Sequence, residues 1–157
     1  MCIRDSFDTH ETFIDESYAA EIQAMKIVMM RTCEELMRDG KSEKAAEMAK
    51  KFFSAFPHFN FPYDDSVMPF IETLNETGHQ AEAREHMDIL ATELYQRLLF
   101  YDSLDESEFE SFRQDYGFAL RGTTEILKSV DGLGDAEFAK RIKELISQYD
   151  ISNVRKG

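Results

Sequence analysis

Residues 40–42 read Gly-Lys-Ser, which is how the loop that holds phosphate in many nucleotide-binding proteins ends. The complete loop is G-x-x-x-x-G-K-[ST], because its backbone must curl around the phosphates. Glu35 stands where the first glycine is needed, and its charge repels an anion. The loop must also follow a strand, whereas the apolar residues upstream recur at helical spacing. We therefore interpret Gly-Lys-Ser as the turn between two helices.

Histidine and carboxylate side chains can bind metals or catalyse acid–base chemistry, but their spacing here favours neither. His79 and His86 are seven positions apart, with Glu82 between them. Seven positions span about 10 Å of helix axis, which is too far for one ion, and no HExxH motif is present. Carboxylate pairs such as Asp64–Asp65 are typical of an acidic surface, because catalysis needs them held across a cleft. The sequence predicts no catalytic residue, no cofactor and no metal site in this chain.

The composition of the chain is that of a globular protein, whose helices or strands would position any site. It has 157 residues, of which 43% are hydrophobic and 31% charged, enough for one buried core. The formal net charge of −13 argues against nucleic acid or an anionic membrane as partner, because both attract basic surfaces. No run approaches the roughly 20 apolar residues of a membrane span, and no signal-peptide core is found.

Residues 1–6, Met-Cys-Ile-Arg-Asp-Ser, resemble a translated sequencing adapter of the kind found at the ends of metagenomic gene fragments. On this interpretation the chain is the tail of a longer protein. We expect a single helical-repeat domain at residues 7–150 and a frayed basic end at 151–157. Cys33 is then the single cysteine, and a lone thiol on an apolar helix face is usually a packing residue.

Turn residues predict where the first helices begin and end. Asp15 or Ser17 can cap a first helix that ends near Arg38, where Gly40 supplies the positive φ of a helix C-terminus. Ser42 is the predicted N-cap of the second helix, which stops before a proline.

Similar signals continue downstream. Asp65 or Ser66 can cap a third helix, and Asp105 with Glu108 forms a capping-box-like start for a fifth. The expected fold is all-α, with about six helices in three antiparallel hairpins at residues 15–56, 66–101 and 106–149.

The first two hairpins carry a repeat. Three pairs of residues lie 38 positions apart: Leu36 with Leu74, Gly40 with Gly78, and Ala45 with Ala83. An alanine five positions after each glycine places a small side chain where antiparallel helices cross closely. Gly40, Ala45 and Pro57 also match offsets of the tetratricopeptide repeat, although Tyr95 stands where the second repeat would have proline. These features predict a tetratricopeptide-like right-handed superhelix.

An aromatic connector, Phe-Pro-His-Phe-Asn-Phe-Pro-Tyr-Asp-Asp, follows the second helix. One interpretation is that it packs back over the junction of two hairpins, fixed by its prolines, and this is the one we favour. The other is a groove whose ring faces stack on a peptide or a sugar. In that case the contact residues would be Phe59, Phe61, Tyr63 and Asp64, the last two at the groove lip.

The order of these short motifs resembles the C-terminal tails of glycosyltransferase family 117-like proteins. These are large bacterial membrane proteins related to protein O-mannosyltransferases. The matching elements are Phe13–Glu16, Gly40–Ala45, Pro57, Pro62–Asp65, Gly78–Ala83 and Phe100–Leu104. They cover about residues 12–149, and Asp65 replaces the second aromatic residue of the family's connector.

The resemblance implies a non-catalytic helical-repeat domain on a membrane glycosyltransferase-like protein, at the periplasmic face of the bacterial inner membrane. Its partners would be a protein or peptide, such as a glycosylation acceptor, and the membrane portion of its own chain. No catalytic residue transfers, because the membrane part is not in this sequence. The alternative is a free-standing, cytoplasmic adaptor that binds a peptide in its groove. An all-helical enzyme is a third possibility, for which the sequence offers no candidate residues.

Overall fold

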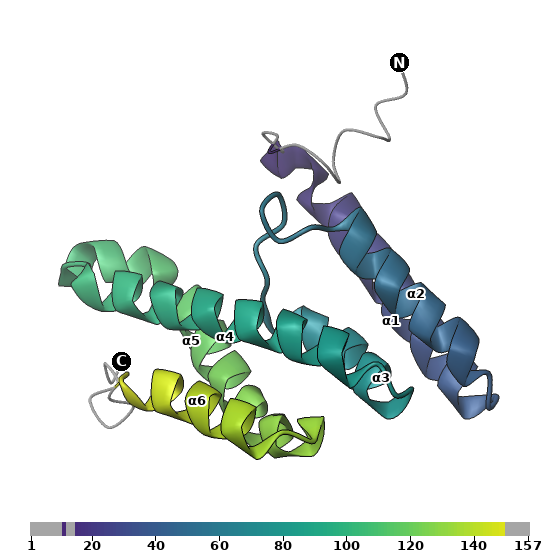
Figure 1. The fold of residues 1–157 in the computed structure, drawn as a ribbon. Coiled ribbons are helices and arrows are strands. Elements are labelled where there is room, and N and C mark those ends of the chain that lie inside the picture. Colours follow the sequence, from purple (N-terminus) through teal and green to yellow (C-terminus); the bar gives the residue numbers. More distant parts are fainter. Residues whose placement is uncertain (1–10, 12–14, 150–157) are drawn as a thin grey trace. The chain divides into compact units, whose positions relative to one another are not determined.

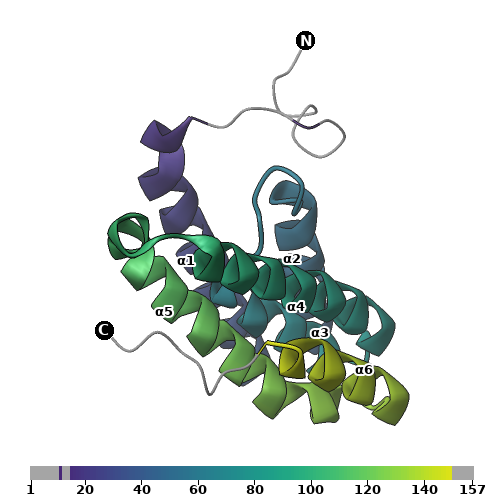
Figure 2. The same ribbon diagram turned by 90° about the vertical axis from the view of Figure 1, so that its left-hand side faces the viewer.

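A computed structural model of the chain describes residues 11 and 15–149, and all regular structure in that part is helical (Figures 1 and 2). The α-helices are α1 (Ala19–Arg38), α2 (Ser42–Ala55), α3 (Met68–Glu76), α4 (Gln80–Ser103), α5 (Glu106–Ser129) and α6 (Ala136–Ser147). In the described residues, three short 3-10 turns accompany them: η2 (Glu16–Tyr18), η3 (Asp65–Val67) and η4 (Val130–Leu133). The all-α prediction with six helices is confirmed for these residues. The adapter-like residues 1–6 and the tail 151–157 lie outside them.

The described residues divide into two compact units. The first contains the chain up to Pro62 together with Ser66–Ala83, and the second contains Tyr63–Asp65 and the chain from Arg84 onward. The last three residues of the connector, Tyr63–Asp65, therefore belong to the second unit. The expectation of a single domain over residues 7–150 stays a prediction.

In the first unit, α1 and α2 lie side by side (Figures 1 and 2). The Cys33 thiol lies 3.8 Å from the backbone oxygen of Ala45, and both residues are buried. A larger side chain than alanine would hold the two helices apart at this point. Cys33 is thus a packing residue, as expected. Further along, the Phe52 ring stacks on that of Phe70, with centroids 3.7 Å apart and planes within 6°.

The turn at Gly40 has the geometry that the sequence predicts. Gly40 has a φ of 71°, its N–H donates to Met37 over 3.0 Å, and the Lys41 N–H donates to Leu36 over 2.8 Å. These two bonds define a Schellman motif, which satisfies carbonyls left open at the helix end. The Ala45 N–H then donates to the Lys41 carbonyl over 3.1 Å and begins α2.

The turn at Gly78 repeats this geometry 38 positions later. Gly78 has a φ of 86°, its N–H donates to Asn75 over 3.1 Å, and the His79 N–H donates to Leu74 over 2.8 Å. The Ala83 N–H donates to His79 over 3.0 Å, as its counterpart does after Gly40. Ala45 and Ala83 are both fully buried. The sequence repeat is therefore also a repeat of local backbone structure.

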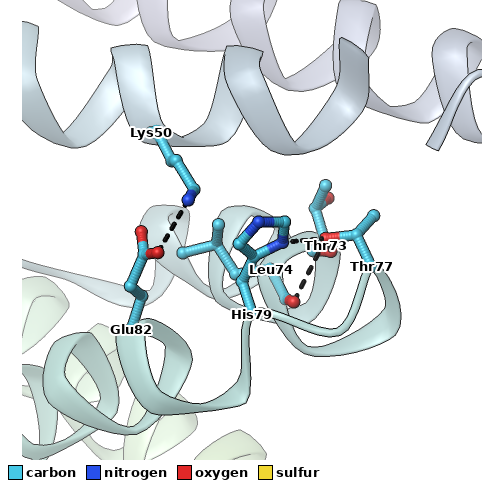
Figure 3. Close-up of polar contacts among 6 residues, drawn as sticks. All are labelled: Lys50, Thr73, Leu74, Thr77, His79 and Glu82. Carbon is cyan, nitrogen blue, oxygen red and sulfur yellow. Dashed lines mark hydrogen bonds and ion pairs between the residues drawn. The ribbon is translucent and has the colours of Figure 1, made fainter. Parts of the chain in front are cut away.

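Figure 3 shows the side chains around this second turn. The Thr77 hydroxyl donates to the Leu74 carbonyl over 3.1 Å and lies 3.2 Å from His79 Nδ1. The Lys50 ammonium group reaches across from α2 to the Glu82 carboxylate at 2.7 Å. Both side chains of that ion pair are about 40% exposed, so it contributes well under about 1 kcal/mol.

Two predicted N-caps are wrong. Ser42 is already the first residue of α2, and Lys41 holds the N-cap position without a side-chain bond. The Schellman turn leaves too few residues for a separate serine cap. Neither Asp65 nor Ser66 caps α3, because both lie in the turn η3 and Val67 takes the N-cap position. Asp15 accepts a 2.8 Å hydrogen bond from the Ser17 N–H, but the helix α1 begins only after η2.

In the second unit, the Asp105 capping box is confirmed. Its carboxylate accepts hydrogen bonds from the Ser107 and Glu108 N–H groups, each over 2.9 Å, and the Glu108 side chain accepts the Asp105 N–H. The Tyr116 and Tyr149 hydroxyls lie 2.9 Å apart in the interior of this unit. Arg141 of α6 pairs with Asp88 of α4 at 2.9 Å.

Candidate ligand-binding site

The four predicted groove residues are divided between the two units. Phe59 and Phe61 belong to the first. The Phe61 ring packs edge-on against Phe56, with centroids 5.1 Å apart, and Phe56 in turn lies 5.3 Å from the Phe52 ring of α2. Phe59 is 41% exposed, and its nearest ring neighbour is His58 at 5.9 Å. Pro57, the third residue of the tetratricopeptide-like set, is buried.

Tyr63 belongs to the second unit and is 2% exposed. Its N–H donates to the Glu93 carboxylate, and its hydroxyl lies 3.1 Å from His86 Nδ1. Burial, reinforced by the charges of Glu93 and Glu85, raises the pKa of the Tyr63 phenol well above its ordinary range. Its ring is therefore an anchor for the connector and presents no open face to a ligand.

Asp64 lines a cavity of about 130 Å³ that lies entirely within the second unit. Two helices and the connector form its walls. The lining residues are Asp64 and Asp65 of the connector, Leu94, Arg97 and Tyr101 of α4, and Asp115, Phe118 and Ala119 of α5. In α4 the three positions are three, four and seven apart, and in α5 Asp115 precedes Phe118 by three and Ala119 by four, so each set shares one helix face.

Gly122 lies where α5 meets the Leu94 side chain of α4. A Cβ atom added at this position would lie 2.7 Å from Leu94 Cδ1 and 3.5 Å from Asp65 Cβ. A side chain here would therefore require the end of the buried Leu94 side chain to shift, whereas its contact with Asp65 would be an ordinary one. Gly122 comes three residues after Ala119, so these two small residues lie on the same face of α5.

An ion pair holds the connector on α5. Arg121 donates from its Nε over 2.9 Å and from a terminal nitrogen over 2.6 Å, both to one carboxylate oxygen of Asp65. The guanidinium carbon also lies 4.9 Å from the centre of the Phe118 ring. This arrangement neutralises Asp65 and shows that the Phe118 ring accepts a cation.

Charges of both signs act on Tyr101. Burial raises the pKa of its phenol, the charge of Asp115 raises it further, and Arg97 lowers it by less. Asp115 therefore acts on the Tyr101 phenol more strongly than Arg97 does. Asp115 is exposed, and within the described part of the chain no ion pair involves it.

The lining offers groups that can bind a ligand. Although three aspartates line the cavity, no group of three or more His, Cys, Asp or Glu side chains in the described residues is arranged to hold a metal ion. His79 and His86 are engaged by Thr77 and by Tyr63. Carboxylates, a guanidinium group and two aromatic rings offer hydrogen-bond acceptors, charge and π faces.

Sequence reasoning found Asp64 but missed Arg97, Tyr101, Asp115 and Phe118. Spacing of three, four and seven residues indicates which residues share a helix face. It does not indicate which face of α4 meets which face of α5. The signal that could have helped is Gly122, since a glycine inside a helix often marks a close approach.

The chain gives no significant match to any protein-family description, curated protein or solved structure. In the described residues, none of the helices combines the length and the apolar character needed to cross a bilayer.

Proposed function

We propose that this chain is a non-catalytic, tetratricopeptide-like domain that binds a protein or peptide. The single observation that supports the proposal best is the pair of matching turns at Gly40 and Gly78. Each is a Schellman motif, and each is followed five residues later by a fully buried alanine. Repeated helical hairpins stack through nearest-neighbour contacts and so present an extended binding surface.

The proposal also covers the way in which the helical hairpins stack. Three antiparallel hairpins at residues 15–56, 66–101 and 106–149 would stack into a right-handed superhelix. Residual dipolar couplings measured on the labelled chain test this, because they report helix directions in solution. We expect antiparallel axes for α3 and α4 and again for α5 and α6. Perpendicular axes in either pair would remove the repeat architecture.

We also propose that the domain is the C-terminal tail of a membrane glycosyltransferase-like protein of the family 117 type. In that protein it would hold an acceptor protein or another partner at the periplasmic face of the inner membrane. The ordered motifs from Gly40–Ala45 to Phe100–Leu104 support this assignment. Catalysis would then reside in the membrane portion of the parent protein.

Sequencing the source DNA upstream of Phe7 tests the assignment directly. Several hydrophobic spans that run in frame into residues 7–16 are the expected result. A start codon beside residue 1, preceded by a ribosome-binding site, would refute the membrane assignment. It would instead support the alternative of a free-standing, cytoplasmic adaptor, which shares the repeat architecture.

A further inference from the structure

We propose that this chain forms a two-fold symmetric dimer in which α1 packs antiparallel against α1 of a second copy. The dimer would be a property beyond the proposed function, and it does not depend on that function. Its contact surface would be the α1 seam, by which we mean six positions: Tyr18, Glu21, Met25, Val28, Thr32 and Glu35.

The α1 seam has the spacing of a coiled coil. Its positions lie alternately three and four residues apart, which keeps them on one side of a helix. The apolar members face solvent, since Tyr18 is 61% exposed, Met25 55% and Val28 64%. Val28 comes five positions before the buried Cys33, about 140° around the helix axis. The helix α2, which contacts Cys33, therefore leaves Val28 uncovered.

The exposed side of the last helix, α6, is different. Within the described part of the chain, none of the exposed large hydrophobic side chains belongs to α6. The exposed residues of α6 are charged or small: Ala136, Glu137, Lys140, Arg141, Glu144 and Ser147. Such a face suits contact with water, whereas apolar side chains gathered on one face mark a contact surface. We therefore expect the α1 seam to be covered in solution.

Charge favours a second copy of the chain as the occupant. Residues 17–32 contain one acidic and two basic residues, whereas the whole chain carries −13. Two strongly acidic molecules repel one another, and this segment is a place where they can meet with little local repulsion. A strongly basic or strongly acidic partner would gain little attraction from so small a local charge.

The polar residues of the α1 seam favour the antiparallel direction. When Met25 lies opposite Val28 of the second copy, facing positions are equally far from the midpoint of these two residues. Tyr18 then faces Glu35, whose carboxylate can accept a hydrogen bond from the phenol. In a parallel pair each residue would face its own counterpart, so two Glu35 carboxylates would repel one another.

An ion pair between the copies is also possible in the antiparallel direction. Glu21 faces Thr32 of the second copy and so lies beside Arg31. Both Glu21 and Arg31 are exposed, and within the described residues neither takes part in an ion pair. The two-fold axis would form this pair twice, once on each side of the central apolar contact.

Sedimentation velocity in reducing buffer, from low micromolar to nearly millimolar protein, tests the dimer. The full chain should pass from monomer to dimer as its concentration rises. A contact through one helix of each copy is small, so we expect an affinity in the micromolar range or weaker.

Matched variants locate the contact. Val28→Lys should weaken the dimer at least about tenfold, because it buries a charge at the centre of the contact. Val28 is more than half exposed in the single chain, so this variant is expected to fold. Phe100→Lys is the control, because it makes a similar change at a half-exposed side chain of α4, outside the α1 seam. It should leave the affinity unchanged.

A charge exchange tests the direction of the two helices. Glu21→Arg and Arg31→Glu should each weaken the dimer about threefold or more, the scale of an exposed ion pair. The double variant restores the pair with its charges exchanged, so its affinity should return to that of the parent chain. In a parallel dimer these two positions do not face one another, and the double variant would not recover.

Several results would overturn the proposal. They are a chain that stays monomeric over the whole concentration range, a dimer that Val28→Lys leaves intact, or equal losses in Val28→Lys and Phe100→Lys. A double variant that fails to recover would overturn the antiparallel contact. None of these results alters the gene upstream of Phe7 or the helix directions within one chain, so the proposed domain role is tested separately.

Discussion

Replacing Gly40 by valine tests the turn on which the repeat depends. Gly40 has a φ of 71°, in the left-handed region that β-branched residues strongly resist. No heavy atom lies within 4 Å of a Cβ built at this position, so an alanine side chain meets no neighbour. The cost of Gly40→Ala is therefore backbone strain alone.

The expected loss of stability can be estimated from the cost of backbone strain. A residue with a Cβ atom pays about 1–2 kcal/mol in the left-handed conformation. Strain at a position of this kind spans about 1–3 kcal/mol, and valine should lie toward its upper end. Asparagine tolerates positive φ better than other non-glycine residues, so it should cost least. We expect stability to fall in the order Gly40, Gly40→Asn, Gly40→Ala, Gly40→Val.

Equilibrium urea denaturation, followed by far-ultraviolet circular dichroism, measures the free energy of unfolding of each variant and so tests this order of stability. Each kcal/mol should also lower the melting temperature by about 2–4 °C in a chain of this length. Gly117→Ala is the matched control, because Gly117 lies inside α5 in open space and without positive φ. That variant should gain about 0.5–1 kcal/mol. A Gly40→Val protein as stable as the parent would refute the turn, and an alanine variant worse than valine would refute the strain argument.

Three further substitutions test the second unit. Gly122→Ala should be about 1–3 kcal/mol less stable than Gly117→Ala in urea denaturation, because both gain helix stability but only the first brings a Cβ to 2.7 Å from the buried Leu94 side chain; equal stability would contradict the close approach. Asp105→Ala should cost about 1 kcal/mol and Asp105→Ser much less, since serine can still cap α5; equal losses would exclude the capping bond. Burial, Glu93 and Glu85 raise the pKa of Tyr63 above 10.0 in the folded chain, so the unfolded state loses this proton first. The free energy of unfolding should then fall as pH rises past about 10, and Tyr63→Phe should lessen that fall when the two proteins are compared by urea denaturation at each pH.

The local backbone could be predicted because its signals are short-range. A glycine followed five positions later by alanine gave both helix turns and both buried alanines. The Asp105–Glu108 spacing gave the capping box, although aspartate replaces the usual serine or threonine. In each case the residues that decide the structure lie within about one turn of one another.

The extent of burial along α1 could not be predicted in the same way. Its apolar residues recur at helical spacing, and Cys33 is buried as expected. Met25 and Val28 share that pattern but are more than half exposed. A helical period identifies an apolar face, but α2 has 14 residues against the 20 of α1. A shorter neighbour cannot cover the whole face, and periodicity contains no information about a neighbour's length.

The Asp65 carboxylate has two possible kinds of partner, and sequence alone does not show which one it binds. As a residue just before a helix, its carboxylate could cap backbone N–H groups, which is a common role for aspartate. The structure gives it two hydrogen bonds from Arg121, which is 56 positions away. Bonds that join two opposite charges are stronger than one from a neutral N–H, provided that both groups are held in place. The Phe118 ring, whose centre lies 4.9 Å from the guanidinium carbon, helps to hold Arg121 in that position.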